Sequence, residues 1–419
     1  MLRRLFPNVY EGWIVVASFA AVVVMIGTAF FYGFGTIFTP VIEEFGWSHA
    51  TTSFAFSLRS EVGGIAAPIV GLLIDRFGPR RALGVGIVVS VLGVLGMSFM
   101  HNIWQFYLAM FVIALGVSAS GGPVGMAATA TWFERRRSRA LAALTVGGGV
   151  SGLGVVAVAW LVEAAGWRDA LRVLAVVLLI VGAFATANVR ARPANHPQPM
   201  DGVPDDGSPG AAPREPLWGV PMREVLRSRS FLGVALGQAA VNFGTTSVIV
   251  HIIPFMESEG ISKTAAASTV TAYTFISLVG RLGFGYLADH IDKRLILAIS
   301  SAMVAVSIPL LAIVHSVPAT IAVMVVMAPG FGGTIPVRPA ILADYFGTRY
   351  FGTVNGAMVF VMTIGAFFGP LLVGRVVDVT GQYTLGWLLC GGVTALAVPL
   401  MLSARPPHRL IARYRRETT

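Results

Sequence analysis

Long apolar runs alternate with short polar segments along most of this chain, and the pattern predicts helices that cross a membrane. About 20 residues at 1.5 Å each are enough to span the ~30 Å hydrocarbon core of a bilayer. Alternation of apolar and polar residues in ~10-residue segments, which would indicate a β-barrel, is absent from the sequence. We therefore predict an all-α polytopic membrane protein with 12 transmembrane helices. The predicted spans cover residues 12–37, 51–74, 82–100, 104–126, 140–162, 169–189, 230–254, 264–287, 295–314, 318–341, 353–375 and 384–403.

A polar stretch in the middle of the chain separates six spans from the next six. It begins RARPANHPQPMDGVPDDGSPGAAPREP, and its Pro, Gly and Asp content cannot bury a core, so it predicts a flexible linker. We expect an N-terminal six-helix bundle over 1–189, a cytoplasmic linker over 190–229, a C-terminal six-helix bundle over 230–404 and a basic cytoplasmic tail over 405–419.

The two halves repeat one another. The segment GLLID at 71–75 matches GYLAD at 285–289, 214 residues later, and Pro123 matches Pro336 at a distance of 213 residues. Separate anchors that recur at nearly one offset indicate a duplication. Parallel six-helix repeats joined by a long inner linker are the architecture of major facilitator transporters, whose cavity lies at mid-membrane between the repeats.

Basic residues are distributed unevenly along the chain. It contains 30 Lys and Arg residues and carries a formal net charge of +10. With the N-terminus inside, 24 of them fall on the cytoplasmic side, Arg338 among them, four fall on the outer side, and Arg59 and Arg281 lie inside spans. This positive-inside pattern predicts that both termini are cytoplasmic and argues against a nucleic-acid partner. Because nearly all these residues are Arg, we expect a GC-rich prokaryotic genome and the cytoplasmic (inner) membrane.

The sequence offers no motif for catalysis or for a cofactor. Cys390 is the one cysteine, so neither a disulfide framework nor a cysteine metal site is expected. The segment 147–152 formally satisfies GxGxxG, but it lies in a predicted span and follows no strand. We expect no enzyme, no cofactor and no metal.

Arg281 is the candidate around which the site is organised. It interrupts the apolar run of the eighth span, eight residues and roughly 12 Å of helical rise from Asp289. A cation at this depth is costly, so it is expected to face a cavity or a partner. Thr274 and Ser277 share its helix face, and a guanidinium can bind a carboxylate through two parallel hydrogen bonds. The alternative is a structural arginine that pairs with helix C-termini or extends to the interface.

Several segments resemble known transporters. GLLIDRFGPRR (71–81) and GYLADHIDKR (285–294) resemble the two copies of a loop signature of the major facilitator superfamily. TWFERRRSRALAALTVGGGVSG (131–152) resembles the fifth-span motif of monocarboxylate transporters, and YEGWIVV (10–16) resembles their first-span motif. GRLGFGYLAD (280–289) resembles the eighth-span segment whose arginine, by that resemblance, binds the substrate carboxylate. The chain is thus similar to monocarboxylate transporters and to the related oxalate/formate antiporters.

Departures from these relatives bear on the substrate. Ser277 stands where mammalian-type monocarboxylate carriers have an acidic residue, and the first span lacks their lysine. The oxalate exchangers carry a second cation in the eleventh span, whereas residues 354–374 contain no Lys or Arg. One cation in the cavity suits one negative charge, so we expect a small monocarboxylate rather than a dicarboxylate.

Polar residues of other spans are candidates for the cavity and for proton coupling. Asn242, with Gln238 and Thr246 at four-residue spacing, could line the cavity or hold helices together. His251, near the outer end of the seventh span, is a candidate for substrate and proton binding, with a hydrogen-bonded structural histidine as the alternative. Glu61 is the best carboxyl for proton coupling, with pairing to a neighbouring span as the alternative.

Charged residues at the inner helix ends form two predicted gating latches. Asp75, Arg76 and Arg80 belong to the first Gly-x-x-x-Asp segment, and Asp289 and Arg294 belong to its repeat. Charges that must separate when the cavity opens inward provide a two-state gate. Topology signals alone would explain the arginines but not the repeated Gly-x-x-x-Asp.

Together these features predict a secondary active transporter of small monocarboxylates such as lactate, pyruvate or formate, proton-coupled and working by alternating access. Its expected partners are the small organic anion, protons and the lipid bilayer, and we expect a functional monomer. Facilitated transport, organic-anion exchange, and export of drugs or metabolites by the same fold remain open. A non-transporting sensor would need a signalling domain, for which the linker and the tail offer little room.

Overall fold

The structure is a computed structural model that describes residues 9–32, 34–47, 49–193, 196, 198–202 and 218–416. Side chains are described for all of these except 31–32, 34–35, 38–39, 49–60 and 263–264. The chain divides into two compact units. Unit 1 comprises Met1–Leu217 and Thr348–Ala357, and unit 2 comprises Trp218–Gly347 and Met358–Thr419.

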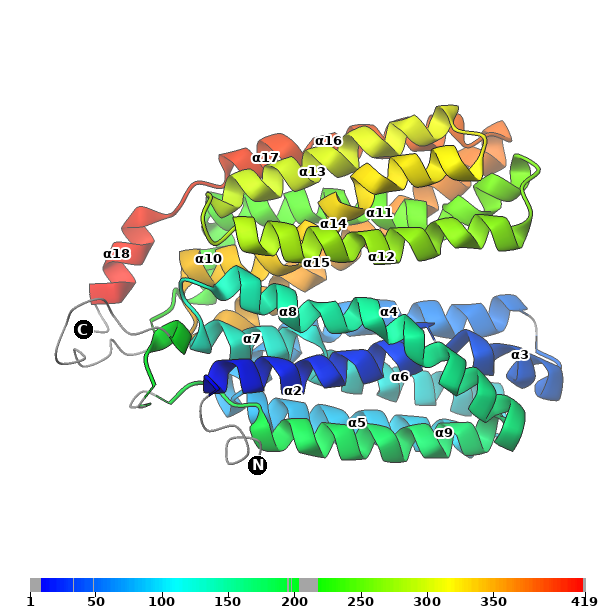
Figure 1. Ribbon diagram of the computed structural model, residues 1–419, viewed down its shortest axis with the longest axis horizontal. Helices are drawn as coiled ribbons and strands as arrows, with labels where there is room; N and C mark the ends of the chain where they lie inside the picture. The colour runs from blue at the N-terminus through cyan, green and yellow to red at the C-terminus, as the bar shows by residue number, and fades with distance from the viewer. Residues whose placement is uncertain are drawn as a thin grey trace. The chain divides into compact units, whose positions relative to one another are not determined.

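Unit 1 is a helical bundle whose long helices run alongside one another, coloured blue to green in Figure 1. A π-helical segment, η1, follows α2, and α9 bends at Gly166, where a φ of 80° departs from helical geometry. The elements are α2 (Glu11–Ile26), η1 (Gly27–Tyr32), α3 (Phe34–Phe45), α4 (His49–Phe77), α5 (Pro79–Ser98), α6 (Ile103–Ser120), α7 (Gly122–Trp132), α8 (Arg137–Val150), η2 (Ser151–Gly154), α9 (Val155–Asn188) and the short turn η3 (Met200–Gly202).

Unit 2 is a second helical bundle, coloured green to red in Figure 1, and it ends in a short basic helix. The elements are α10 (Met222–Arg227), α11 (Arg229–Ser258), α12 (Lys263–Leu287), α13 (Lys293–Leu310), η4 (Leu311–Ile313), α14 (Val317–Phe346), α15 (Phe351–Thr380), α16 (Thr384–Ala395), α17 (Ala397–Ser403) and α18 (His408–Arg416). The first turns of α15, up to Ala357, are grouped with unit 1.

The helices account for every predicted span. Within the described residues, nine segments are long and apolar enough to cross a membrane. One of them, Arg137–Asn188, contains both the fifth and the sixth predicted span, which meet at the bend of Gly166. The second and eighth predicted spans correspond to α4 and α12, which carry more polar side chains and complete the set.

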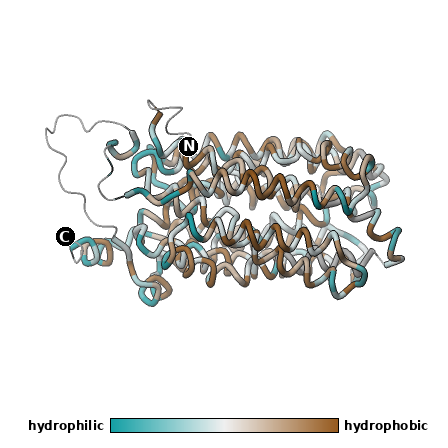
Figure 2. The backbone as a smooth tube through the Cα atoms, turned by 90° about the horizontal axis from the view of Figure 1, so that it is seen from below, coloured by the Kyte–Doolittle hydropathy of each residue, from teal (hydrophilic) through white to brown (hydrophobic). Residues whose placement is uncertain are grey.

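Apolar side chains occupy both the interior and the outside of each unit. Large side chains such as Trp132 in unit 1 and Trp387 in unit 2 are fully buried, whereas Ile180 and Val279 are more than 60% exposed. Apolar stretches follow the long helices and polar residues gather near their ends (Figure 2). Exposed apolar side chains along helices of membrane length are suited to contact lipid tails.

Part of the predicted linker contacts unit 1. Arg190 and His196 both pair with the buried carboxylate of Glu11 at the start of α2, with His196 Nε2 2.8 Å from its oxygen. The carboxylate of Asp201 accepts hydrogen bonds from the backbone amides of residues 134–136, at 3.0 to 3.3 Å, just before α8 begins. This carboxylate satisfies amides that a helix N-terminus would otherwise leave without partners. Arg190, His196 and Asp201 of the predicted linker are therefore held against the helices of unit 1.

Candidate functional site

Arg281 lies near the C-terminal end of α12 (Lys263–Leu287). The helix starts at an N-cap, Ser262, whose side chain accepts a hydrogen bond from the Ala265 amide, and it runs without proline to Leu287. Arg281 is six residues from that end, about 9 Å by helical rise. Its side chain is half-buried, and the Nε atom is covered. Its depth in the membrane stays a prediction.

The backbone of α14 passes directly against this part of α12. A Cβ atom added at Gly332 would lie 2.1 Å from the Ser277 carbonyl oxygen and 3.2 Å from the Arg281 amide nitrogen. Only a residue without a side chain allows so close an approach. Next to Gly332, the ring of Phe331 stacks on Tyr273 with ring centroids 5.9 Å apart. The backbone of α12 at Ser277 and Arg281 is therefore held in a tight contact with α14.

Thr274 and Ser277 lie on the same helix face as Arg281 but in different surroundings. Ser277 is buried in the contact with α14, and its hydroxyl donates to the Thr274 carbonyl oxygen at 2.7 Å. The Thr274 hydroxyl donates to the Val270 carbonyl oxygen at 2.9 Å, and its side chain is half-buried. Both hydroxyl hydrogens are thus directed to the helix backbone, which leaves their oxygens as acceptors. Substrate contact by these two residues stays a prediction.

The two candidates on α11 form hydrogen bonds to backbone carbonyls. Asn242 donates from Nδ2 to the Gln238 carbonyl oxygen on its own helix at 2.9 Å. His251 Nε2 lies 2.9 Å from the carbonyl oxygen of Pro370 on α15, and its ring centroid is 6.0 Å from that of Tyr383. Because a carbonyl only accepts, Nε2 of His251 is the donor in this hydrogen bond.

Glu61 lies on α4, and its side chain is half-buried. Neighbouring Arg59 belongs to the part of α4 whose side chains are outside the described residues. Proton coupling by Glu61 stays a prediction.

Asp75 joins the end of α4 to the first turn of α15, within unit 1. Its carboxylate accepts hydrogen bonds from the Gly352 amide at 2.7 Å, the Thr353 amide at 2.7 Å and the Thr353 hydroxyl at 2.6 Å. A carboxylate at this position accepts hydrogen bonds from the amides at the helix N-terminus, and its negative charge interacts favourably with the positive end of the helix dipole. Gly71 permits the approach, since a Cβ there would lie 2.2 Å from the Gly352 oxygen.

The other predicted latch residues have different surroundings. Arg294 binds Asp292 through its backbone amide at 2.8 Å and through its guanidinium at 3.2 Å, and it also donates to the Leu402 carbonyl oxygen at 3.3 Å. Asp289 is half-buried just beyond α12. Arg76 is exposed beside the Phe77 ring, and Arg80 is exposed at the start of α5. The two Gly-x-x-x-Asp copies therefore differ in their described contacts.

Two residues next to the predicted site were not singled out by sequence. Gly332 belongs to the run GFGG, and its small residues in a span are the signal of a close helix contact. Arg338 was counted with the arginines of the cytoplasmic side, but in the structure it lies eight residues inside α14, about 12 Å from the end of the helix, and only 7% of it is exposed. Its position between Pro336 and Pro339, inside the apolar run, was the available signal.

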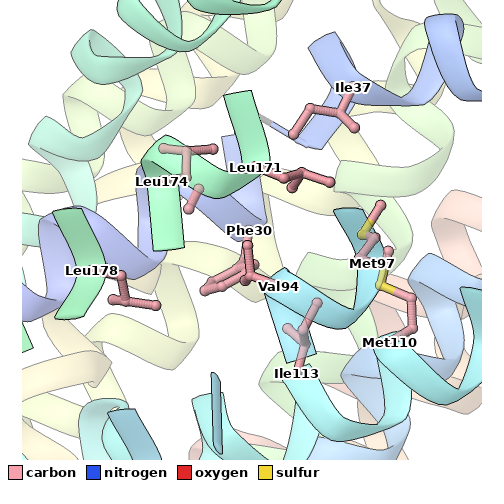
Figure 3. Close-up of a pocket in the computed structure, with 10 residues that line it drawn as sticks. Phe30, Ile37, Val94, Met97, Met110, Ile113, Leu171, Leu174 and Leu178 are labelled. Carbon is pink, nitrogen blue, oxygen red and sulfur yellow. The ribbon is translucent and has the colours of Figure 1, made fainter. Parts of the chain in front are cut away.

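Unit 1 contains an apolar pocket between its helices (Figure 3). None of its lining residues is charged, so it offers no group for a carboxylate. The residues that line it are Ala29, Phe30, Ile37, Val94, Met97, Met110, Ile113, Leu171, Leu174 and Leu178. In the part of the chain that the structure describes, no three His, Cys, Asp or Glu residues are grouped as metal ligands.

Comparison with known proteins gives consistent matches. The family model described as "Major Facilitator Superfamily" matches residues 17–243 and 234–417. Monocarboxylate transporter 13 of Bos taurus is 27% identical over 92% of this chain and 87% of its own length. Monocarboxylate transporter 2 of Homo sapiens is 25% identical over 98% of this chain and 89% of its own length. The crystal structure of the transporter FucP in its outward conformation superimposes with a TM-score of 0.74, at 14% identity, over 94% of this chain and 99% of that chain.

Proposed function

Since the chain belongs to the Major Facilitator Superfamily and is a multi-pass membrane transporter with a 12-helix, two-repeat fold, we propose that its substrates are small monocarboxylates such as lactate, pyruvate or formate. The transport is secondary active and proton-coupled. We further propose that the protein acts as a monomer in the cytoplasmic membrane of a prokaryote, with both termini in the cytoplasm. The monocarboxylate transporters among its relatives support the substrate class.

The observation that carries the proposal is the position of Arg281. A half-buried guanidinium inside an apolar helix has a large desolvation cost, which a bound anion reduces. Its planar fork fits the two oxygens of one carboxylate.

Alternating access follows from the two repeats. In our proposal the anion binds Arg281 with Thr274, Ser277, Asn242 and His251 as further contacts, and the two bundles then rock about it. The hydrogen bonds of Asp75 to the first turn of α15 hold one arrangement and must break before another forms. The remaining latch residues are Arg76, Arg80, Asp289 and Arg294.

Protons have two candidate carriers. His251 can take up a proton at Nδ1 while Nε2 keeps its hydrogen bond to Pro370, so protonation need not disturb the helix contact. Glu61 is a half-buried carboxyl on α4. Protonation of either would add one positive charge to the transporter and offset the charge of the incoming anion.

The test is uptake of radiolabelled lactate into proteoliposomes, with and without an inward proton gradient. Wild type should show uptake stimulated by the gradient. Arg281→Lys keeps the charge but loses the bidentate geometry, so we expect a loss of roughly 10- to 100-fold in initial rate, equivalent to one charge-assisted hydrogen bond of about 1.5–3 kcal/mol. Arg349→Lys, at an exposed arginine after α14, is the matched control and should transport as wild type does. Folded wild-type protein without any lactate uptake would refute the proposal and favour the exporter.

Anion exchange is the second candidate. Helix α12 contains no Asp or Glu, and Ser277, at the position of the acidic residue in the resembled carriers, is packed against Gly332. Arg281 thus has no carboxyl on its own helix to alternate with the substrate. Uptake that ignores the gradient but requires lactate or formate inside the vesicle would establish exchange.

A further inference from the structure

Arg338 is a buried cation in the middle of unit 2. It lies on α14, and only 7% of the residue is exposed. Its Nη1 atom donates to the thioether sulfur of Met362 on α15 at 2.7 Å, and its Nε atom is buried without a partner among the described residues. A thioether is a weak acceptor, whereas a guanidinium has five N–H donors.

Among the described residues of α14 and α15, no acidic side chain is placed to neutralise it. Asp344, the one acid of α14, lies six residues further on and pairs with Lys293 at 2.8 Å. The one acid of α15 is Asp378, sixteen residues beyond Met362. Buried charges in proteins are paired, and ionisable residues inside membrane spans mark ion or substrate pathways. An anion from outside the chain would neutralise the buried charge of Arg338.

The position of Arg338 differs from that of Arg281. Gly332, which touches the Arg281 backbone, is six residues before Arg338 on α14, a rise of about 9 Å. At about 100° per residue, the two positions leave α14 on faces about 120° apart. Arg281 emerges where α14 meets α12, whereas Arg338 points to α15. One small carboxylate cannot bind both guanidinium groups through two hydrogen bonds at once.

We propose that Arg338 is a second binding site for a small carboxylate, nearer than Arg281 to the end of α14 at Phe346. The inference rests on the proposed function and adds a second station for the same class of substrate. The anion accepts two hydrogen bonds from the guanidinium and displaces the contact with Met362. In this proposal a substrate that dissociates from Arg281 binds next to Arg338.

The experiment measures thermal unfolding of purified protein in nanodiscs, in a sulfonate buffer without chloride, as formate is added. Formate is the smallest carboxylate and tests the site without requiring transport. The variants are wild type, Arg338→Met and Arg281→Met, with Arg349→Met as the control at an exposed arginine. Binding to the folded state alone raises the apparent Tm with ligand concentration, by about 2 to 5 °C at one hundred times Kd.

Wild type should gain stability in two phases, at two formate concentrations. Arg338→Met should lose one phase and keep the other, Arg281→Met should do the reverse, and Arg349→Met should show both. Without formate, Arg338→Met should unfold at or above the wild-type temperature, because an apolar side chain of similar volume replaces a buried unpaired charge.

If Arg338 has only a structural role, the titration gives different results. If Arg338→Met lowers the Tm by several degrees without formate and keeps both phases, the proposal is overturned. It is overturned as well if chloride reproduces the Arg338-dependent phase and formate does not, since the site would then be one for an inorganic anion. Absence of lactate transport by the wild-type protein in proteoliposomes would refute the proposed function separately, because the formate titration measures binding and does not depend on transport.

Discussion

Gly332→Ala tests the contact that positions Arg281. The added methyl group would lie 2.1 Å from the Ser277 carbonyl oxygen, whereas ordinary contact begins at 3.4 Å, so the two backbones must separate by about 3.4 − 2.1 = 1.3 Å at this point. The obstacle is backbone rather than a flexible side chain, so rotamer changes cannot relieve it. Overpacking of this kind costs about 1–3 kcal/mol.

The displacement reaches the site directly, because the same methyl group would lie 3.2 Å from the Arg281 amide nitrogen. A misplacement of about 1 Å can lower a rate roughly 100-fold. We therefore expect Gly332→Ala to reduce the initial rate of lactate uptake by 10- to 100-fold and to lower the thermal stability in detergent.

Gly283→Ala is the matched control. Gly283 is two residues from Arg281 on α12, and a Cβ there would have nothing within 4 Å. Since Ala favours helices over Gly, this variant should fold at least as stably as wild type and transport normally. If Gly332→Ala transports like Gly283→Ala, the close approach of α14 does not position Arg281, and the account of the site is wrong.

Three further substitutions test contacts of unit 1. Asp75→Asn removes the charge that accepts from Thr353 and its neighbouring amide, so we expect a loss of about 1–2 kcal/mol in stability and a changed rate of lactate exchange. Asp201→Ala leaves three amides before α8 without their acceptor, so trypsin should cleave at Arg190 or Arg192 faster than in wild type. Glu44→Gln removes a carboxylate that accepts a hydrogen bond from Arg168 at 2.6 Å, a contact that lowers the pKa of Glu44 below its usual 4.5. The ion pair therefore stabilises the folded protein above pH 4.5, and this stabilisation is lost as the pH falls further.

The controls use groups with weaker contacts. Thr353→Val removes one of the three hydrogen bonds to Asp75 and should have a smaller effect than Asp75→Asn. Asp169→Ala breaks an exposed pair with Arg172 and should leave the cleavage rate unchanged. Glu44→Gln should cost at most about 1 kcal/mol at pH 7, since the side chain is 39% exposed, and progressively less as the pH falls below 4.5. Equal pH profiles for Glu44→Gln and wild type would contradict the ion-pair explanation.

The repeated apolar runs were sufficient to predict the helices, because membrane thickness fixes their length and the bilayer requires internal hydrogen bonding. Helix breaks were harder to predict. The bend at Gly166 and the π-helical Gly27–Tyr32 depend on packing around them, and no residue pattern specified them. The linker was interpreted from composition alone, yet Arg190 and Asp201 each have a partner in unit 1.

At the site, the helix that carries Arg281 could be predicted and its neighbours could not. An apolar run of this length predicts a helix, because about 20 residues span the hydrocarbon core. The burial of Ser277 depends on which helix packs on that face, and one sequence does not state this. Arg338 lies inside the predicted span 318–341 but close to its end, so it was counted with the inner arginines. The helix continues five residues further, to Phe346, and burial by α15 depends on packing that one sequence does not state.

The helices α12 and α14 meet at more than one level. A Cβ at Gly280 would lie 2.0 Å from the Pro329 oxygen, one helical turn from the contact at Gly332. Two such notches at different heights interlock the helices, which opposes sliding or turning of one helix along the other. The two helices are therefore expected to move as one rigid body, with Arg281 at a fixed distance from α14. Bending during a cycle would then fall to softer joints, such as the π-helical turn at Gly27–Tyr32 and the kink at Gly166.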